Sequence, residues 1–130
     1  MLAGLDGCNK GWMACIQQEN HCEFSWFSSI DDFLKKYPDI TYVGIDIVIG
    51  LPEQAQKGGR LSEQQARKYL GKRGSSVFSA PCRSAVYAKS YKDALQQSRE
   101  SSPDQIGLSK QTYNIIPLIK DVDITLRNNP

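Results

Sequence analysis

The chain has 130 residues, of which 40% are hydrophobic and 23% charged, and its formal net charge is +2. These values exclude an intrinsically disordered chain, and the length predicts a single domain over residues 1–130. No run approaches the roughly 20 apolar residues of a transmembrane helix, and no signal peptide is evident, so we expect a cytoplasmic protein without membrane contacts.

The first part of the chain predicts three strands joined by short turns. Each run is rich in apolar or aromatic residues, and glycine, asparagine or polar residues separate the runs. Consecutive strands with short connections form an antiparallel meander. We expect the strands at residues 2–6, 12–16 and 22–27.

A helix and a fourth strand follow. Ser29 is a suitable N-cap for a helix that runs to Lys36 and ends before Pro38. Residues 40–49 form the most apolar run of the chain. Such a run after a crossover helix is typical of a central parallel strand covered on both faces.

The second half is mainly helical in its predicted structure. Ser62 is a candidate N-cap for a helix that ends at Gly71, and residues 74–83 resemble a loop. In the final helix, apolar residues recur at helical spacing, and Pro117 is expected to kink it or break its first turns. The two remaining helices are expected at residues 90–100 and 108–127, with a linker at 101–107.

Two aspartates occupy similar local patterns. Asp6 follows glycine and leucine in the first strand, and Asp46 follows glycine and isoleucine in the apolar run. An unpaired aspartate in an apolar setting is costly to bury, so Asp46 requires a partner. The alternative interpretations are an Asp-Gly turn at Asp6 and capping of backbone amides by Asp46.

Other chemistry has little support in the sequence. With one histidine, His21, the sequence does not favour histidine-based triads or multi-histidine metal sites. No two cysteines have the C-x-x-C spacing of zinc or dithiol sites, so we expect free thiols at Cys8, Cys15, Cys22 and Cys82. Strand aromatics either form the core or stack on nucleic-acid bases, and we expect core for Trp12, Phe24, Trp26 and Phe27.

The element order and four motifs carry a family resemblance. A meander, a helix and a parallel strand resemble the opening of the ribonuclease H-like fold, in which the first and fourth strands are neighbours. The chain also resembles the domain of unknown function 429 family, described as predicted nucleases of that fold. The matching motifs are GLDGCNKGW at 4–12, GIDIVIGLP at 44–52, ARKYLGKRGSSVFSAPCR at 66–83 and GLSKQTYNIIPLIKDVD at 107–123.

This resemblance implies an α/β fold and a metal site. It makes Asp6 and Asp46 the catalytic, metal-binding acids for Mg²⁺ or Mn²⁺, with Asp123 as a third catalytic acid. Two such ions can activate water and stabilise the leaving oxygen in phosphodiester hydrolysis. Similar family members continue into a further strand and helix, so the resemblance implies a fold that is incomplete at the C-terminus. We hypothesise that a second copy of the chain covers the missing surface.

Residues 57–92 contain nine lysines and arginines but only one acid, Glu63. This surplus is able to meet the phosphates of DNA or RNA, and a solvated helix face is the alternative interpretation. The residue Glu63 occurs in Arg60-Leu61-Ser62-Glu63, where the family pattern usually shows Arg-x-Cys-Asp. Motif positions by resemblance are Arg67, Arg73, Ser76, Arg83 and Gln111, and the predicted nucleic-acid contacts are Arg60, Arg67, Lys72, Arg73, Ser76 and Arg83.

Two alternatives to a nuclease remain. The first is a catalytically inactive domain that binds nucleic acid or protein and retains the two acids only as structure. The second is an actin-like phosphotransferase module, which shares the strand order and the Gly-x-Asp-Gly opening. Such enzymes contain two domains of this kind, for which 130 residues are too few.

Overall fold

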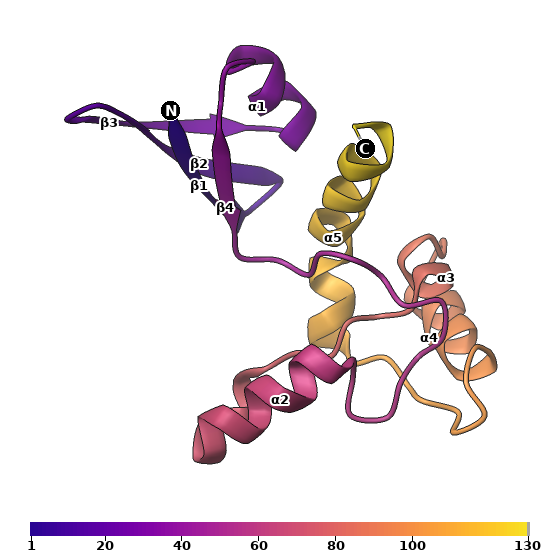
Figure 1. The fold of residues 1–130 in the computed structure, drawn as a ribbon. Coiled ribbons are helices and arrows are strands. Elements are labelled where there is room, and N and C mark those ends of the chain that lie inside the picture. The colour runs from indigo at the N-terminus through magenta and orange to yellow at the C-terminus, as the bar shows by residue number, and fades with distance from the viewer. Residues whose placement is uncertain (130) are drawn as a thin grey trace. The chain divides into compact units, whose positions relative to one another are not determined.

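The structure is a computed structural model that describes residues 1–129, and the chain divides into two compact units (Figure 1). The first unit contains residues 1–49 and 121–129, and the second contains residues 50–120. The division does not show whether the two units fold as one domain, so the single domain expected over residues 1–130 stays a prediction. No helix within residues 1–129 has both the length and the hydropathy needed to cross a bilayer.

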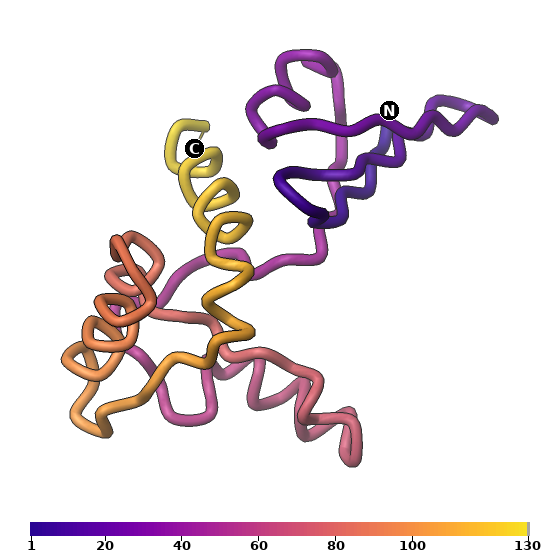
Figure 2. The backbone as a smooth tube through the Cα atoms, turned by 180° about the vertical axis from the view of Figure 1, so that it is seen from behind, coloured from indigo at the N-terminus to yellow at the C-terminus, as the bar shows by residue number. Residues whose placement is uncertain are grey.

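The first unit contains a mixed four-stranded sheet with the order β3-β2-β1-β4. The pairs β1–β2 and β2–β3 are antiparallel, whereas β4 returns after helix α1 and pairs with β1 in parallel (Figure 2). The predicted meander and the adjacency of the first and fourth strands are therefore confirmed. The strands are β1 (Leu2–Cys8), β2 (Gly11–Gln18), β3 (His21–Phe27) and β4 (Tyr42–Ile45).

The prediction of a central fourth strand is wrong. Residues 40–49 were expected to be strand and covered on both faces, but β4 spans only Tyr42–Ile45 and lies at an edge of the sheet. The side chain of Tyr42 is 71% exposed, and Ile49 beyond the strand is 50% exposed. A continuous apolar run does not specify how many neighbours a strand has, and within residues 1–129 β4 pairs with β1 alone.

One face of this sheet forms the core of the first unit. Alternate strand residues point to it, and helix α1 (Ile30–Lys36) covers it with Phe33, which is fully buried. The rings of Phe27 and Phe33 meet edge to face with centroids 5.4 Å apart. Other buried residues on this face are Leu5, Trp12, Ala14 and Ile16.

The opposite face of the sheet is exposed. Phe24 is 69% and Trp26 52% exposed, so the expectation that both belong to the core is wrong, whereas it is confirmed for Trp12 and Phe27. The reason is the two-residue period of a strand, which sends residues 24 and 26 away from residue 27. We call this surface the open face; its residues include Leu2, Gly4, Asp6, Met13, Cys15, Phe24, Trp26, Tyr42 and Gly44.

Helix α1 has the predicted ends. The Ser29 side chain accepts a hydrogen bond from the Asp32 backbone N–H, which confirms the N-cap. Two acids occupy the first turn and two lysines the last, which complements the helix dipole. Hydrogen bonds from the Ser28 hydroxyl and at Ser29 lower the pKa of Asp32, because they favour the ionised carboxyl group.

Asp121 connects three elements of the first unit. It belongs to helix α5 (Lys110–Asn128), and its Oδ2 atom accepts hydrogen bonds from Trp12 Nε1 at 2.7 Å and from the Ile30 backbone N–H at 2.9 Å. Trp12 is in β2, and Ile30 opens α1. One carboxylate therefore joins the sheet, the start of α1 and the last turns of α5.

The second unit is helical, and several of its boundaries differ from expectation. The N-cap of α2 is Arg60, not Ser62, and residues 74–83 are not all loop, because a 3₁₀-helix and α3 extend into them. Helix α5 continues through Pro117, so the predicted break is absent. The elements are α2 (Leu61–Leu70), η1 (Gly71–Ser76), α3 (Arg83–Val86), α4 (Tyr91–Glu100) and the first turns of α5.

We predict that Asp121→Ala lowers the free energy of unfolding by about 2–3 kcal/mol, because two donors lose a charged acceptor. Urea unfolding followed by tryptophan fluorescence measures this loss. The matched control is Asp31→Ala, which removes an exposed carboxylate paired with Lys35 and should cost less than about 0.5 kcal/mol. Equal losses in the two variants would contradict the role assigned to Asp121.

Candidate functional site

Asp6 and Asp46 come from adjacent strands at the same end of the sheet. In the parallel pairing, Leu5 lies opposite Ile45; Asp6 follows Leu5 in β1, and Asp46 follows directly after the end of β4. The Asp46 backbone N–H donates to the Leu5 carbonyl at 3.4 Å, which continues the pairing past the end of β4. Because paired strands lie about 4.8 Å apart, the two aspartates occupy neighbouring positions.

The two acids line one wide, open pocket of about 660 Å³ on the open face. Both side chains are exposed, so the expectation that Asp46 is held in an apolar, buried setting is wrong. The strand edge leaves Asp46 in contact with solvent, where its charge carries no burial cost. The other lining residues are Gly4, Leu5, Met13, Cys15, Phe24, Gly44 and Ile45.

The carboxylates of Asp6 and Asp46 make no hydrogen bond or ion pair with the residues that the structure describes. Asp6 lies inside β1, so the Asp-Gly turn interpretation is wrong. Asp46 accepts no backbone amide of residues 1–129, so the capping interpretation is wrong as well. Two neighbouring negative charges repel one another, and a bound cation would stabilise the pair.

No third ligand joins this pair. Among residues 1–129, no group of three histidine, cysteine, aspartate or glutamate side chains is placed to hold a metal ion. Asp123, expected as the third acid, lies buried in α5. The structure therefore brings Asp6 and Asp46 together, but it does not add Asp123 to a cluster with them.

One cysteine lies beside the two aspartates. All four thiols are free, as predicted. Cys15 lines the pocket, and its pKa is raised, first because its surroundings remove water from the thiolate and then because Cys22 is close. A raised pKa disfavours the thiolate, which is the form that binds metals and attacks electrophiles.

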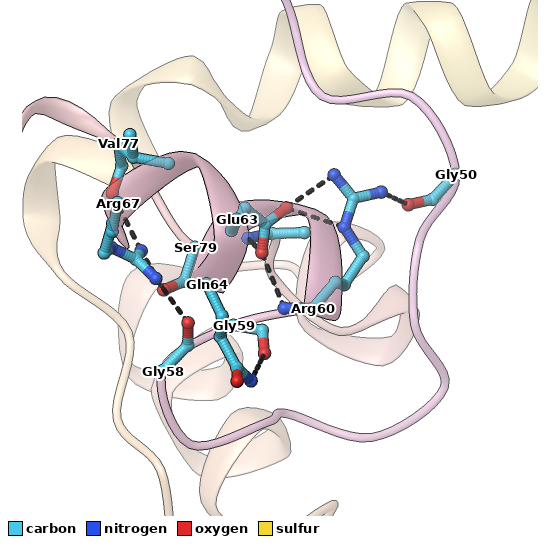
Figure 3. Close-up of polar contacts among 10 residues, drawn as sticks. Gly50, Gly58, Gly59, Arg60, Glu63, Gln64, Arg67, Val77 and Ser79 are labelled. Carbon is cyan, nitrogen blue, oxygen red and sulfur yellow. Dashed lines mark hydrogen bonds and ion pairs between the residues drawn. The ribbon is translucent and has the colours of Figure 1, made fainter. Parts of the chain in front are cut away.

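Arg60 is bonded within the second unit and to its own helix (Figure 3). Its backbone N–H donates to Glu63 Oε2 at 2.7 Å, its Nε donates to Glu63 Oε1 at 2.6 Å, and its Nη1 donates to the Gly50 carbonyl. The Ala80 backbone N–H also donates to Glu63, at 3.2 Å. Glu63 is only 6% exposed, so this carboxylate organises the start of α2 from a buried position.

Arg67 and Arg83 also bond to their own unit. Arg67 donates to the carbonyls of Gly58 and Val77 and to the Ser79 hydroxyl (Figure 3). Arg83 donates to Glu53 at 3.0 Å. These donors hold loops together, and the nucleic-acid contacts expected of these arginines stay predictions.

The other predicted contact residues are Lys72, Arg73 and Ser76, and all three are exposed in η1. None of their side chains has a hydrogen bond or ion pair with another residue in the range 1–129. Their side chains are therefore available to a ligand. Gln111, a motif position by resemblance, is also exposed and lines a pocket of the second unit.

Sequence reasoning missed the importance of Glu63, although a signal was present. A capping box places an acid three residues after the N-cap, and Arg60 and Glu63 have that spacing. The N-cap was predicted at Ser62 because serine is a favoured N-cap residue, but this serine lies two residues after the true N-cap. The neighbouring Gly59 has φ +79°, and a Cβ there would lie 2.4 Å from Glu63 Oε2, so a side chain would displace the carboxylate.

We predict that Glu63→Ala lowers the free energy of unfolding by about 3 kcal/mol, because Arg60 and the Ala80 N–H lose a buried acceptor. The loss of far-UV circular dichroism in urea measures this change in the helical unit. As the control, Glu53→Ala removes an exposed partner of Arg83 and should cost less than about 1 kcal/mol. If Glu63→Ala is no more destabilising than Glu53→Ala, the buried network does not stabilise α2.

The family model described as "Protein of unknown function (DUF429)" matches residues 4–130. The matched range includes both aspartates of the pocket and the Arg60–Glu63 network. No curated protein and no solved structure has a significant match to the chain.

Proposed function

The chain belongs to the family described as "Protein of unknown function (DUF429)", and from this premise we propose that it is a metal-dependent nuclease of ribonuclease H-like fold. The proposed reaction is hydrolysis of phosphodiester bonds in DNA or RNA. The observation that supports it is the pair of unpartnered carboxylates, Asp6 and Asp46, on neighbouring strands in one open pocket.

The donor set fits Mg²⁺ or Mn²⁺. Mg²⁺ commonly uses one or two carboxylates, keeps several waters and completes its shell with substrate phosphate. Asp6 and Asp46 supply two hard oxygen ligands and leave the remaining positions to water and substrate. An ion held there would polarise a phosphoryl oxygen and lower the pKa of bound water.

The chain's residues have two roles in this proposal. Asp6 is fixed between β2 and β4, since Leu5 pairs with Ala14 on one side and Ile45 on the other, so its carboxylate starts from a rigid backbone. The nucleic-acid substrate is a polyanion, so its binding requires positive charge outside the acidic pocket. The second unit contains 12 lysines and arginines against five acids, and Lys72 and Arg73 are exposed there.

One observation favours a second candidate function, which is nucleic-acid binding without cleavage. Among residues 1–129, no third acid joins Asp6 and Asp46. Two-metal hydrolysis needs enough ligands to hold two ions about 4 Å apart, and two carboxylates are few for that purpose. A metal-bound but non-hydrolytic domain would retain both acids and bind substrate without turnover.

We predict that the protein binds Mn²⁺ and cleaves labelled DNA or RNA, and that Asp6→Asn, Asp46→Asn and the double variant each lose Mn²⁺ binding. Titration followed by the electron paramagnetic resonance signal of free Mn²⁺ measures binding, and gel electrophoresis measures cleavage. Each variant removes one anionic ligand from a site to which residues 1–129 supply two, so cleavage should fall by at least about 100-fold, or roughly 3 kcal/mol.

The matched control is Asp39→Asn. Asp39 lies in the same unit, is exposed and has no partner among residues 1–129, but it does not line the pocket. The Asp39→Asn variant should therefore bind Mn²⁺ and cleave nucleic acid as the unaltered protein does. Mn²⁺ binding that persists in the double variant would refute the site, whereas binding without cleavage would favour the second candidate.

A further inference from the structure

The open face places two exposed aromatic rings in register with the carboxylates. The cross-strand row that contains Asp6 continues through Met13 to Trp26. The neighbouring row contains Gly4, Cys15 and Phe24, and Gly44 lies beyond Gly4 on β4. Acids and aromatic rings thus lie on the same surface, about 10 Å apart by the spacing of strands.

The exposed rings are not needed to fill the core. Trp12 and Phe27 fill the opposite face and are 0% and 7% exposed, whereas Trp26 is 52% and Phe24 69% exposed. The Trp26 ring also lies close to Gly11, where an added Cβ would be 2.9 Å from the ring. Backbone thus limits the ring on one side while much of its surface faces solvent.

We propose that the open face binds single-stranded nucleic acid, with bases stacked on Phe24 and Trp26 and an adjoining phosphate directed to Asp6 and Asp46. The position of the phosphate rests on the proposed function. Stacking on aromatic side chains tolerates any base, because every base has a π face. A four-stranded sheet with exposed strand aromatics is a surface that single strands can occupy.

Two glycines leave the sheet surface beside Phe24 without side chains. A Cβ added at Gly4 would have no heavy atom within 4 Å, and at Gly44 the nearest is the Ala3 carbonyl oxygen at 3.8 Å. A side chain or a ligand atom could therefore occupy the space directly above these two positions without a clash. A sugar or phosphate can approach the sheet closely between the aromatic rings and the acids.

The charge of the first unit determines how a polyanion can bind. This unit contains four lysines and arginines against nine acids, and the pocket itself contains only the two aspartates as charges. A phosphate is repelled there unless a divalent cation is bound. Metal and strand should therefore bind cooperatively, and a duplex, whose bases are already stacked on one another, should bind poorly.

The two tryptophans provide a direct test. Trp12 is buried and Trp26 is exposed, so a base that stacks on the open face should quench Trp26 alone. A ten-nucleotide single strand, titrated into the full chain with Mn²⁺ present, should quench fluorescence saturably, and the same strand in a duplex should not. In Trp26→Phe the quenching should vanish while binding, followed by fluorescence anisotropy of a labelled strand, is retained.

A second variant measures the contribution of stacking. Phe24→Ala should weaken strand binding by about 5- to 150-fold, the range of one lost base–aromatic stack. The matched control is Tyr69→Ala, which removes an aromatic ring that is 91% exposed in the second unit and should leave strand binding unchanged. Equal effects of the two variants would overturn the proposal.

Other outcomes separate this inference from the proposed function. If Mn²⁺ binds but the single strand does not quench Trp26, the stacking surface is refuted while the metal site stands. If the Asp6→Asn, Asp46→Asn double variant no longer responds to Mn²⁺ but the single strand still quenches Trp26, both the metal site and the stacking surface are supported. A dimer that is lost in Phe24→Ala, found by light scattering without any quenching by the strand, would show that a second copy covers the face and would refute the inference.

Discussion

The parallel pairing of β1 with β4 is the constraint on which the candidate site depends. Residues distant in sequence become neighbours only because β4 returns along the direction of β1 after helix α1. A shift of one residue in this register would move every β4 side chain to the other face. In the observed register, Leu5 lies beside Ile45, and Asp6 and Asp46 follow together into the pocket.

The two faces of the sheet have different roles. One face is filled by core residues and fixed by Asp121, whose carboxylate accepts from Trp12 and from the start of α1. The other face exposes carboxylates and aromatic rings that make no contribution to that core. Phe24 and Trp26 are exposed beside the carboxylates, and exposed apolar patches of this kind often mark interaction sites. This division supports the proposal that Phe24 and Trp26 act with Asp6 and Asp46.

Local signals predicted much of the first unit. The turn residues and the Ser29 cap predicted the meander and α1 nearly to their ends. The position of β1 beside β4 was predicted only through the resemblance to the ribonuclease H-like fold. Burial was predicted less well, because a strand's aromatic content does not reveal which face is covered; Trp12 and Phe27 are core, but Phe24 and Trp26 are not. The role of Glu63 depends on Arg60, whose three-residue spacing is the local signal of a capping box, and on Ala80, a distant contact that has no local signature.

The central claim is that Asp6 and Asp46 share one divalent cation. A crystal soaked in MnCl₂, with diffraction data collected near the manganese absorption edge, tests it most directly. The account predicts an anomalous difference peak between the two carboxylates, with Mn²⁺–oxygen distances of about 2.1–2.2 Å, close to those of Mg²⁺. Carboxylates that point away from one another, with no peak between them in a soaked crystal, would contradict it.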